Sequence, residues 1–213
     1  MERRSLACPL PVQFRSEGEK RAFVGYGSVF FNGTPETEYR IWDDYIERIM
    51  PGTFDRAIRE SQDVRGLFNH DSNFILGRST AGTLTLSIDA KGLRYEMPFD
   101  EKDPDHVKVA SKMERGDVSG SSFSFVPTSW VYRVEDEITY CEITDCDLYD
   151  VGPVTFPAYE GATSGMRALR RELAEASRQE ALAWRESQGK DLDQFLLERR
   201  RDLVQQKGLL SKI

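Results

Sequence analysis

The sequence of 213 residues is poor in the residues that build metal centres, disulfide frameworks and membrane spans. It contains two histidines and three cysteines, and Cys8, Cys141 and Cys146 form no Cys-x-x-Cys pair and no zinc-ligand spacing with either histidine. No hydrophobic run approaches the roughly 18 residues of a membrane span. The sequence therefore predicts no metal, no cofactor and no membrane segment, with the cysteines in the reduced form.

An excess of basic residues is also missing, because the formal net charge is -7. A protein that binds nucleic acid non-specifically needs positive charge to compensate the phosphates. The glycines of Gly25-Tyr26-Gly27 do not form a phosphate-binding loop, since the third glycine is absent and a strand-like segment follows. We therefore expect no nucleic-acid partner.

What the sequence does contain is a series of short β-rich segments separated by turn residues. This pattern predicts a mostly β fold of the α+β class, either a barrel or a sandwich, with few helices. The expected strands are residues 12–14, 23–31, 40–49, 64–69, 83–88, 92–99, 118–125, 129–134, 138–144 and 148–156.

Two short helices are expected within this β-rich part of the chain. The first covers residues 54–61 with Thr53 as its N-cap. The second covers residues 105–115 with Gly116 as its C-cap. Its apolar residues at near-helical spacing predict the buried face, and these are Val107, Ala110 and Met113.

The composition changes after Pro157, because Arg, Glu, Gln, Ala and Leu dominate from about Met166 onward and no proline occurs there. Apolar stripes at helical spacing indicate amphipathic helices in this part of the chain. We therefore expect an N-terminal extension (1–19), a β-rich core (20–166) and a charged helical C-terminal tail (167–213).

The two histidines are the candidates for a general base. His70 follows an apolar run, at a point where a strand meets a loop, and functional residues are often found at such points. A surface histidine at a turn explains the same position equally well. His106 lies at the start of the second expected helix, where a structural role is the better explanation.

The candidate nucleophile is Ser122, which lies in a cluster of serines and glycines just before alternating aromatic residues. Small residues let a substrate carbonyl approach and let backbone N–H groups bind the oxyanion. Alternation places Phe123 and Phe125 on one side of the strand and Ser122 and Ser124 on the other. A polar strand face after a glycine turn is the alternative interpretation.

A serine nucleophile needs a base, and the base needs a group that orients it. Spacing alone does not choose among the acidic residues near the end of the β-rich part. These candidates are Glu142, Asp145, Asp147 and Asp150. A Cys/His protease that uses Cys141 or Cys146 is a further alternative, although neither cysteine has glycine-rich surroundings.

Five segments in chain order resemble the motifs of the prohead serine proteases of tailed bacteriophages, which are related in fold to the herpesvirus assemblins. The segments are residues 24–30 (VGYGSVF), 47–54 (ERIMPGTF), 67–71 (LFNHD) with 76–78 (LGR), 115–125 (RGDVSGSSFSF) and 148–159 (LYDVGPVTFPAY). They span roughly residues 20–167. One departure is Asp150, where the family usually has glutamate, and another is Gly152, where it usually has serine.

The resemblance implies an assemblin-like β-barrel core and a serine endopeptidase in which His70 is the general base, Ser122 the nucleophile and Asp150 the orienting acid. Glu142, Asp145 and Asp147 are kept as alternatives to Asp150. The implied partners are the major capsid protein with its scaffolding segment, and the protease itself through self-cleavage and self-association. The implied location is the host cytoplasm, inside the assembling procapsid.

Two alternatives accompany this resemblance. The chain is either an active protease or an inactive module of the same fold that binds during capsid assembly, and the residues at 150 and 152 favour the second. The tail is either a solvated helix or a segment that docks to scaffold or shell and is later removed. The cluster Arg199-Arg200-Arg201 suits an acidic partner.

Overall fold

The structure is a computed structural model that describes residues 3–17, 20–136 and 138–156, together with residues 179, 180, 182–184 and 187. The described chain is rich in strands and has few helices, so the prediction of a mostly β fold is confirmed. The expected tail helices fall almost entirely outside the described residues. Of the described tail residues, Trp184 packs on Tyr132 with ring centroids 5.8 Å apart.

Eleven strands, two α-helices and two 3-10 helices form the structure described between residues 3 and 156. The strands are β1 (Arg4–Cys8), β2 (Gln13–Glu17), β3 (Lys20–Val29), β4 (Tyr39–Trp42), β5 (Tyr45–Ile49), β6 (Arg65–Leu67), β7 (Ile75–Arg78), β8 (Thr85–Ile88), β9 (Gly92–Pro98), β10 (Gly120–Glu135) and β11 (Ile138–Val154). The helices are η1 (Pro35–Thr37), α1 (Asp55–Arg59), η2 (Ser79–Ala81) and α2 (Pro104–Glu114).

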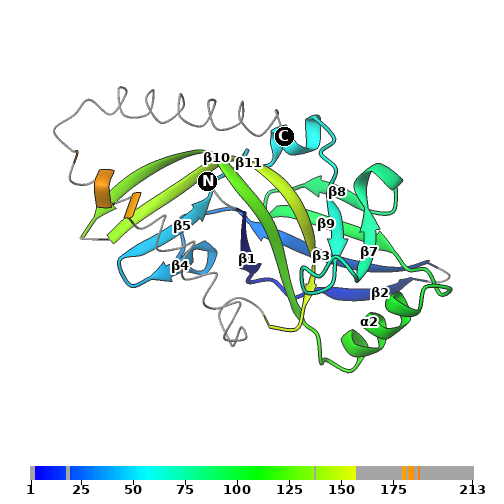
Figure 1. The fold of residues 1–213 in the computed structure, drawn as a ribbon. Helices are drawn as coiled ribbons and strands as arrows, with labels where there is room; N and C mark the ends of the chain where they lie inside the picture. The colour runs from blue at the N-terminus through cyan, green and yellow to red at the C-terminus, as the bar shows by residue number, and fades with distance from the viewer. Residues whose placement is uncertain are drawn as a thin grey trace.

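The strands form two sheets, and the long antiparallel pair β10–β11 is at the centre of the larger one (Figure 1). The larger sheet has the order β1-β10-β11-β5-β4, with β6 and β7 attached through β11. The smaller sheet has the order β2-β3-β9-β8. Strands β5 and β6 both run parallel to β11, but β6 pairs with its second half, at Asp150 and Val151. This second half of β11 is where the candidate site lies.

The two sheets are not closed into the barrel that the resemblance implied. Packed side chains and single backbone hydrogen bonds join them instead, such as the bond from the Phe31 N–H to the Ile49 carbonyl at 2.7 Å. Phe123 on β10 and Tyr95 on β9 are both fully buried in the shared core. Burial of such aromatic side chains stabilises the contact between the sheets without a continuous ladder of hydrogen bonds.

The second half of the chain contains longer strands than expected. The four strands predicted between residues 118 and 156 are two, because β10 continues through Pro127 and β11 continues across residues 145–147. Register shifts occur next to Ser124 and on both sides of Ser129. A bulge accommodates a proline that lacks an N–H group, so the strand continues where the sequence indicated a break.

A second correction concerns residues 40–49, predicted as one strand. They form the hairpin β4–β5, in which Trp42 pairs with Tyr45. The two acidic residues Asp43 and Asp44 lie at the turn. Aspartate is common in turns because its side chain bonds to nearby backbone groups, so this adjacent pair is the sequence signal for the turn.

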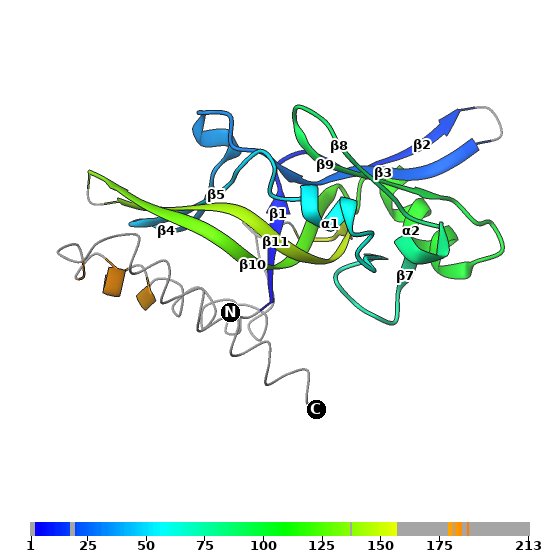
Figure 2. The ribbon, with the colours of Figure 1, turned by 90° about the horizontal axis from the view of Figure 1, so that it is seen from above.

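The helices begin and end close to the predicted residues, but their contacts differ. Helix α1 packs against β11, and α2 lies against β2 and β7 (Figure 2). Thr53 is not the N-cap of α1. Its hydroxyl lies 2.7 Å from the Met50 carbonyl and can donate instead to the Ile143 carbonyl of β11 at the same distance. This bond ties the start of α1 to β11.

In α2 the prediction of the buried face is wrong in part. Val107 is 46% exposed, whereas His106, Val109 and Ala110 are buried. Helix α2 ends at Glu114, and Gly116 follows the C-cap with a φ of +82°, a conformation that glycine adopts without strain.

Candidate active site

The site begins with the alternation of side chains along β10. Phe123 and Phe125 point into the core, are fully buried and stack with ring centroids 4.6 Å apart. Ser122 and Ser124 therefore point to the opposite face of the sheet, as the sequence pattern indicated. Burial of the two rings fixes the register, because a slip by one residue would turn both rings out of the core.

The neighbouring Ser121 is on the core side of β10. Its hydroxyl donates to the Tyr26 carbonyl at 2.7 Å and lies 3.0 Å from the hydroxyl of Tyr95. Ser121 is fully buried between the two sheets. Of these two adjacent serines, Ser122 is the one on the face of His70.

The next strand, β11, places Gly152 opposite Ser122 and Asp150 opposite Ser124. The backbone of Leu67 crosses directly over Gly152, so a Cβ at this position would overlap the Leu67 carbonyl oxygen. The close approach of the Leu67 backbone thus explains why position 152 is a glycine. It lets the segment that leads to His70 lie against the sheet.

His70 is held by a turn of unusual backbone conformation. Asn69 and His70 both have a φ of +57°, and asparagine and histidine tolerate this left-handed region better than most residues. The Asn69 side chain accepts from the Thr155 N–H at 2.7 Å and donates to the Thr155 hydroxyl at 3.1 Å. The Asn69 N–H donates to the Pro153 carbonyl at 3.0 Å. Three hydrogen bonds therefore fix the turn to the end of β11.

The structure brings together the three residues that the resemblance pointed to. Ser122 Oγ lies 2.8 Å from His70 Nε2, and His70 Nδ1 contacts the carboxylate of Asp150. Asp150 and Ser122 are 1% and 2% exposed, and the His70 side chain is 14% exposed. The shorter side chain of aspartate therefore reaches His70 in this fold.

This arrangement fixes the tautomer of the imidazole. A carboxylate accepts, so the proton of His70 lies on Nδ1 and Nε2 is left to accept the Ser122 proton. A positioned histidine with a carboxylate behind it activates a serine hydroxyl as a nucleophile and stabilises the imidazolium that forms. The chemistry that the three residues support is attack by a hydroxyl on a carbonyl carbon.

Strand β1 also reaches the site, which sequence reasoning missed because residues 1–19 were treated as an extension. The Ser122 hydroxyl donates to the Leu6 carbonyl at 2.8 Å. Arg3 contacts the Asp150 carboxylate and donates to Ser124 Oγ at 2.6 Å. The alternation of Leu6 and Cys8 with polar or small residues was the available signal for this strand.

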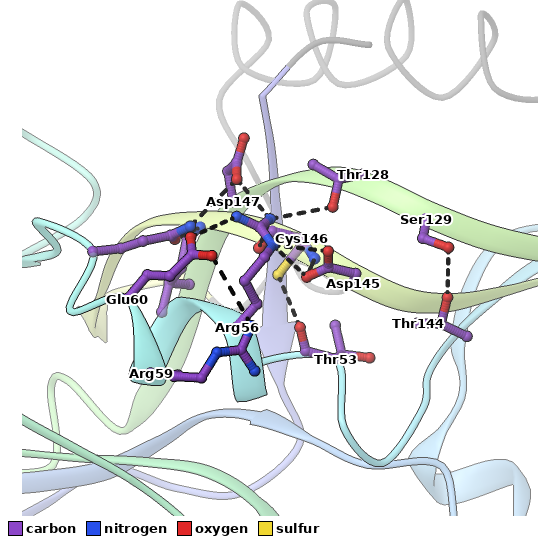
Figure 3. A network of polar contacts seen from close by, with 12 residues as sticks. Thr53, Arg56, Arg59, Glu60, Thr128, Ser129, Thr144, Asp145, Cys146 and Asp147 are labelled. Carbon is purple, nitrogen blue, oxygen red and sulfur yellow. Dashed lines mark hydrogen bonds and ion pairs between the residues drawn. The ribbon is translucent and has the colours of Figure 1, made fainter. Parts of the chain in front are cut away.

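The alternative carboxylates lie away from His70. Arg56 on α1 donates to Asp145 at 2.8 Å and to Asp147 at 2.7 Å, and it also donates to the Cys146 carbonyl at 3.0 Å (Figure 3). Figure 3 shows these side chains around the guanidinium of Arg56. Both carboxylates are therefore part of an arginine cluster that attaches α1 to β11.

Glu142 is further along β11 and has two basic partners of its own. It accepts from Arg133 at 2.8 Å and lies 3.5 Å from Arg48. The structure thus brings Asp150 to His70 and places the other three candidates in separate ion pairs.

The second histidine, His106, has a structural role. His106 is buried, accepts from the Asp100 N–H at 3.0 Å and lies edge-on to Phe23 with ring centroids 5.3 Å apart. These contacts join the start of α2 to the smaller sheet.

The three cysteines are free thiols in buried positions. Burial raises the pKa of Cys8 and of Cys141 to about 12, and it also raises the pKa of Cys146. A neutral thiol is a poor nucleophile, so the Cys/His protease is not supported. Within the described ranges no three His, Cys, Asp or Glu side chains gather in a way that could hold a metal ion. No helix in the described part of the chain has the length and hydrophobicity to cross a membrane.

Comparison with protein-family models finds one whose description is caudovirus prohead serine protease, and it matches residues 10–178. The matched range is well over half of the chain, and it contains His70, Ser122 and Asp150. Neither the curated proteins nor the solved structures include a match to this chain.

Proposed function

Because the chain belongs to the caudovirus prohead serine protease family, we propose that it is a serine endopeptidase of capsid maturation with Ser122, His70 and Asp150 as its catalytic residues. The observation that carries the proposal is the position of His70. One ring nitrogen lies 2.8 Å from Ser122 Oγ and the other contacts the buried Asp150 carboxylate.

In the first half of the reaction, Ser122 Oγ attacks the carbonyl carbon of the scissile peptide bond. His70 Nε2 takes the hydroxyl proton, and the Asp150 carboxylate stabilises the imidazolium through Nδ1–H. When the tetrahedral intermediate collapses, the C–N bond breaks and His70 gives the proton to the leaving amine. The product is an ester between Ser122 and the acyl part of the substrate.

In the second half, water attacks the ester carbonyl and His70 again acts as the base. The ester C–O bond breaks, and the proton returns from His70 to Ser122 Oγ. The carboxylic acid product leaves, and the three residues are in their starting state. None of the reaction steps proposed here uses a metal or cofactor.

We propose two substrates for this activity: the scaffolding part of the major capsid protein and the protease itself. Family membership supports a role in the assembling procapsid of the host cell. The β-rich part (20–166) would then act as the catalytic core, and the tail (167–213) as the segment that docks to scaffold or shell and is cut away. Confinement with the substrate raises its effective concentration, so cleavage does not require high affinity.

The alternative function is an inactive module that keeps the fold and binds during assembly. Asp150 and Gly152 favoured this alternative at the level of sequence. Two contacts now favour the protease, because Asp150 reaches His70 and the absence of a side chain at Gly152 leaves space for the Leu67 backbone.

The test is to express the chain with a capsid protein that carries its scaffolding segment, and to measure intact masses over time. We expect fragments of both proteins with the wild type and none with Ser122→Ala. Fragments with Ser122→Ala as well as with the wild type would show that Ser122 is not the nucleophile. If the capsid protein and the chain itself stay intact in assembled proheads with the wild type as well as with Ser122→Ala, the inactive module is supported.

A further inference from the structure

Strand β1 lies beside the candidate active site, where the Leu6 carbonyl contacts Ser122, and Arg3, the residue just before the strand, contacts Asp150. We propose that β1 is a tethered inhibitory strand that occupies the edge of β10 where an extended substrate peptide binds. The protease is then inactive until β1 leaves this edge. This inference rests on the proposed endopeptidase function and concerns its regulation.

The backbone pairing places β1 where a substrate strand belongs. Strand β1 is antiparallel to β10, and Ala7 is directly opposite Ser122. Among the described strands, β1 pairs with β10 and with no other, so its departure uncovers the edge next to the nucleophile. An exposed edge of this kind binds extended peptides through backbone hydrogen bonds, which suits a peptide substrate.

The Leu6 carbonyl competes with the general base for the proton of the nucleophile. A serine hydroxyl has a single proton to donate. Ser122 Oγ donates to the Leu6 carbonyl at 2.8 Å and lies at the same distance from His70 Nε2. While the proton is directed to Leu6, His70 cannot remove it and the hydroxyl is not activated.

Arg3 interferes with the acid of the same site. Its guanidinium contacts one carboxylate oxygen of Asp150, and His70 contacts the other. An arginine is permanently charged, so it offsets part of the negative charge that should stabilise the imidazolium in the transition state. Both the acid and the nucleophile are thus engaged by one short segment.

The family comparison supports treating β1 as separate from the shared core. The family model matches residues 10–178, and β1 ends at Cys8, before the matched range. The form in which β1 is paired with β10 is called the closed form. The inward side chains of β1 stabilise it, because Leu6 and Cys8 belong to the core and Arg4 contacts the buried Glu47. The closed form is therefore the resting form of the isolated chain.

The first experiment weakens β1 by Arg3→Ala and uses Arg21→Ala as a matched control. Arg3 and Arg21 are similarly exposed, 48% and 40%, and each contacts a carboxylate and an aromatic ring. Arg21 is on β3, in the smaller sheet. Two rates are measured on each full-length variant: labelling of Ser122 by a fluorophosphonate, and alkylation of Cys8 by iodoacetamide.

Cys8 reports the release of β1, because it is the last residue of that strand and is buried in the closed form. We expect Arg3→Ala to raise both rates about tenfold, since it removes a charge-assisted contact that holds the closed state. Arg21→Ala should leave both rates near those of the wild type. Alkylation of Cys141, which is buried in β11, should not change in either variant and excludes general unfolding.

The second experiment locks β1 in place with Ser5→Cys and Ser124→Cys, which are directly opposite each other in the β1–β10 pair. Directly opposed strand residues have the Cα separation that a disulfide needs. We expect the oxidised protein to be labelled about tenfold more slowly than the same protein after reduction. The wild type is taken through the same oxidation and reduction as a control.

Equal labelling rates in the oxidised and reduced forms would overturn the inference and leave the proposed function standing, because Ser122 would still react. Unchanged or lower labelling in Arg3→Ala would also overturn it. Failure of the proposed function has a different signature. Ser122 would then react in no variant and in neither redox state, and both proposals would fall.

Discussion

Strand β11 carries two groups of carboxylates whose surroundings lead to different chemistry. Asp145 and Asp147 share the guanidinium of Arg56, and these three residues are called the Arg56 cluster below. Asp150, further along the same strand, faces the imidazole of His70, which in turn reaches Ser122. The Arg56 cluster is partly exposed, whereas the Asp150 carboxylate is 1% exposed.

The difference lies in the imidazole, which Asp150 faces in addition to Arg3 and which the Arg56 cluster lacks. Arginine stays protonated at any pH that a protein survives, so the Arg56 cluster holds α1 in place and its charge does not change. An imidazole gains and loses a proton near neutral pH, so a carboxylate that faces it supports proton transfer. The same residue type on the same strand is thus structural in one place and suited to catalysis in the other.

The largest effect is expected from exchanging the carboxylate that faces the imidazole. Asp150→Asn keeps the size of the side chain but favours the wrong tautomer of His70, and kcat should fall by about 10⁴-fold. Asp147→Asn is the matched control on the same strand and should leave kcat within about twofold. The rate of capsid-protein cleavage is measured for both variants. Similar losses of kcat would mean that Asp150 and the Arg56 cluster do not differ in their role.

The next largest effect is expected at the glycine below the histidine turn. Gly152→Ala would place a methyl group against the Leu67 carbonyl and push His70 away from Ser122. Displacement of a catalytic group by about 1 Å costs on the order of 10²-fold in kcat. Cleavage rate and thermal midpoint are measured together. A normal rate would mean that the Leu67 backbone is not what positions His70.

A smaller loss is expected from releasing the turn that holds His70. Asn69→Ala removes two side-chain hydrogen bonds to Thr155 and places alanine at a φ of +57°. We expect kcat to fall about tenfold while KM changes little, because the Asn69 side chain is bonded to Thr155 and acts by positioning His70. Asn73→Ala, in the same loop but exposed, is the control. An equal fall in the two variants would point to general loosening of the loop.

The Arg56 cluster should affect stability alone. Arg56→Ala removes the guanidinium that two partly buried carboxylates share, and the free energy of unfolding should fall by about 1–3 kcal/mol. Arg56→Lys should restore part of this loss, since an ammonium cannot reproduce the fork-shaped contact. Denaturant unfolding measures the stability, and cleavage by the remaining folded protein should match the wild type. A specific loss of kcat would connect the cluster to the active site.

The smallest effect is expected at the buried thiol of β11. Burial raises the pKa of Cys141 to about 12, so the reactive thiolate is scarce at neutral pH. Alkylation by iodoacetamide should be barely detectable at pH 8 in the folded protein and complete after denaturation. Mass spectrometry gives the extent of Cys141 alkylation in the folded and in the denatured protein. Rapid alkylation of Cys141 under native conditions would contradict the buried environment.

Much of the local structure follows from the sequence. The alternation of Phe123 and Phe125 with serines predicts the two faces of β10, and turn residues predict most of the strand ends. The long continuous strands were not predictable, because Pro127 usually marks a break and the bulge that accommodates it depends on pairing with β11. The inner face of α2 was mispredicted for a similar reason, since the packed neighbours decide which apolar residues are buried.

For the site, the sequence by itself determined the residue types: one histidine at a strand end, one serine before an aromatic strand and several carboxylates near the end of the core. It did not determine which carboxylate faces His70, nor that β1 lies across Ser122. Only the tertiary structure decided these points, because they depend on strand register and on contacts between residues 80 or more positions apart in the chain. Sequence periodicity specifies which face a side chain occupies, but the partner across that face is set by how the strands pair.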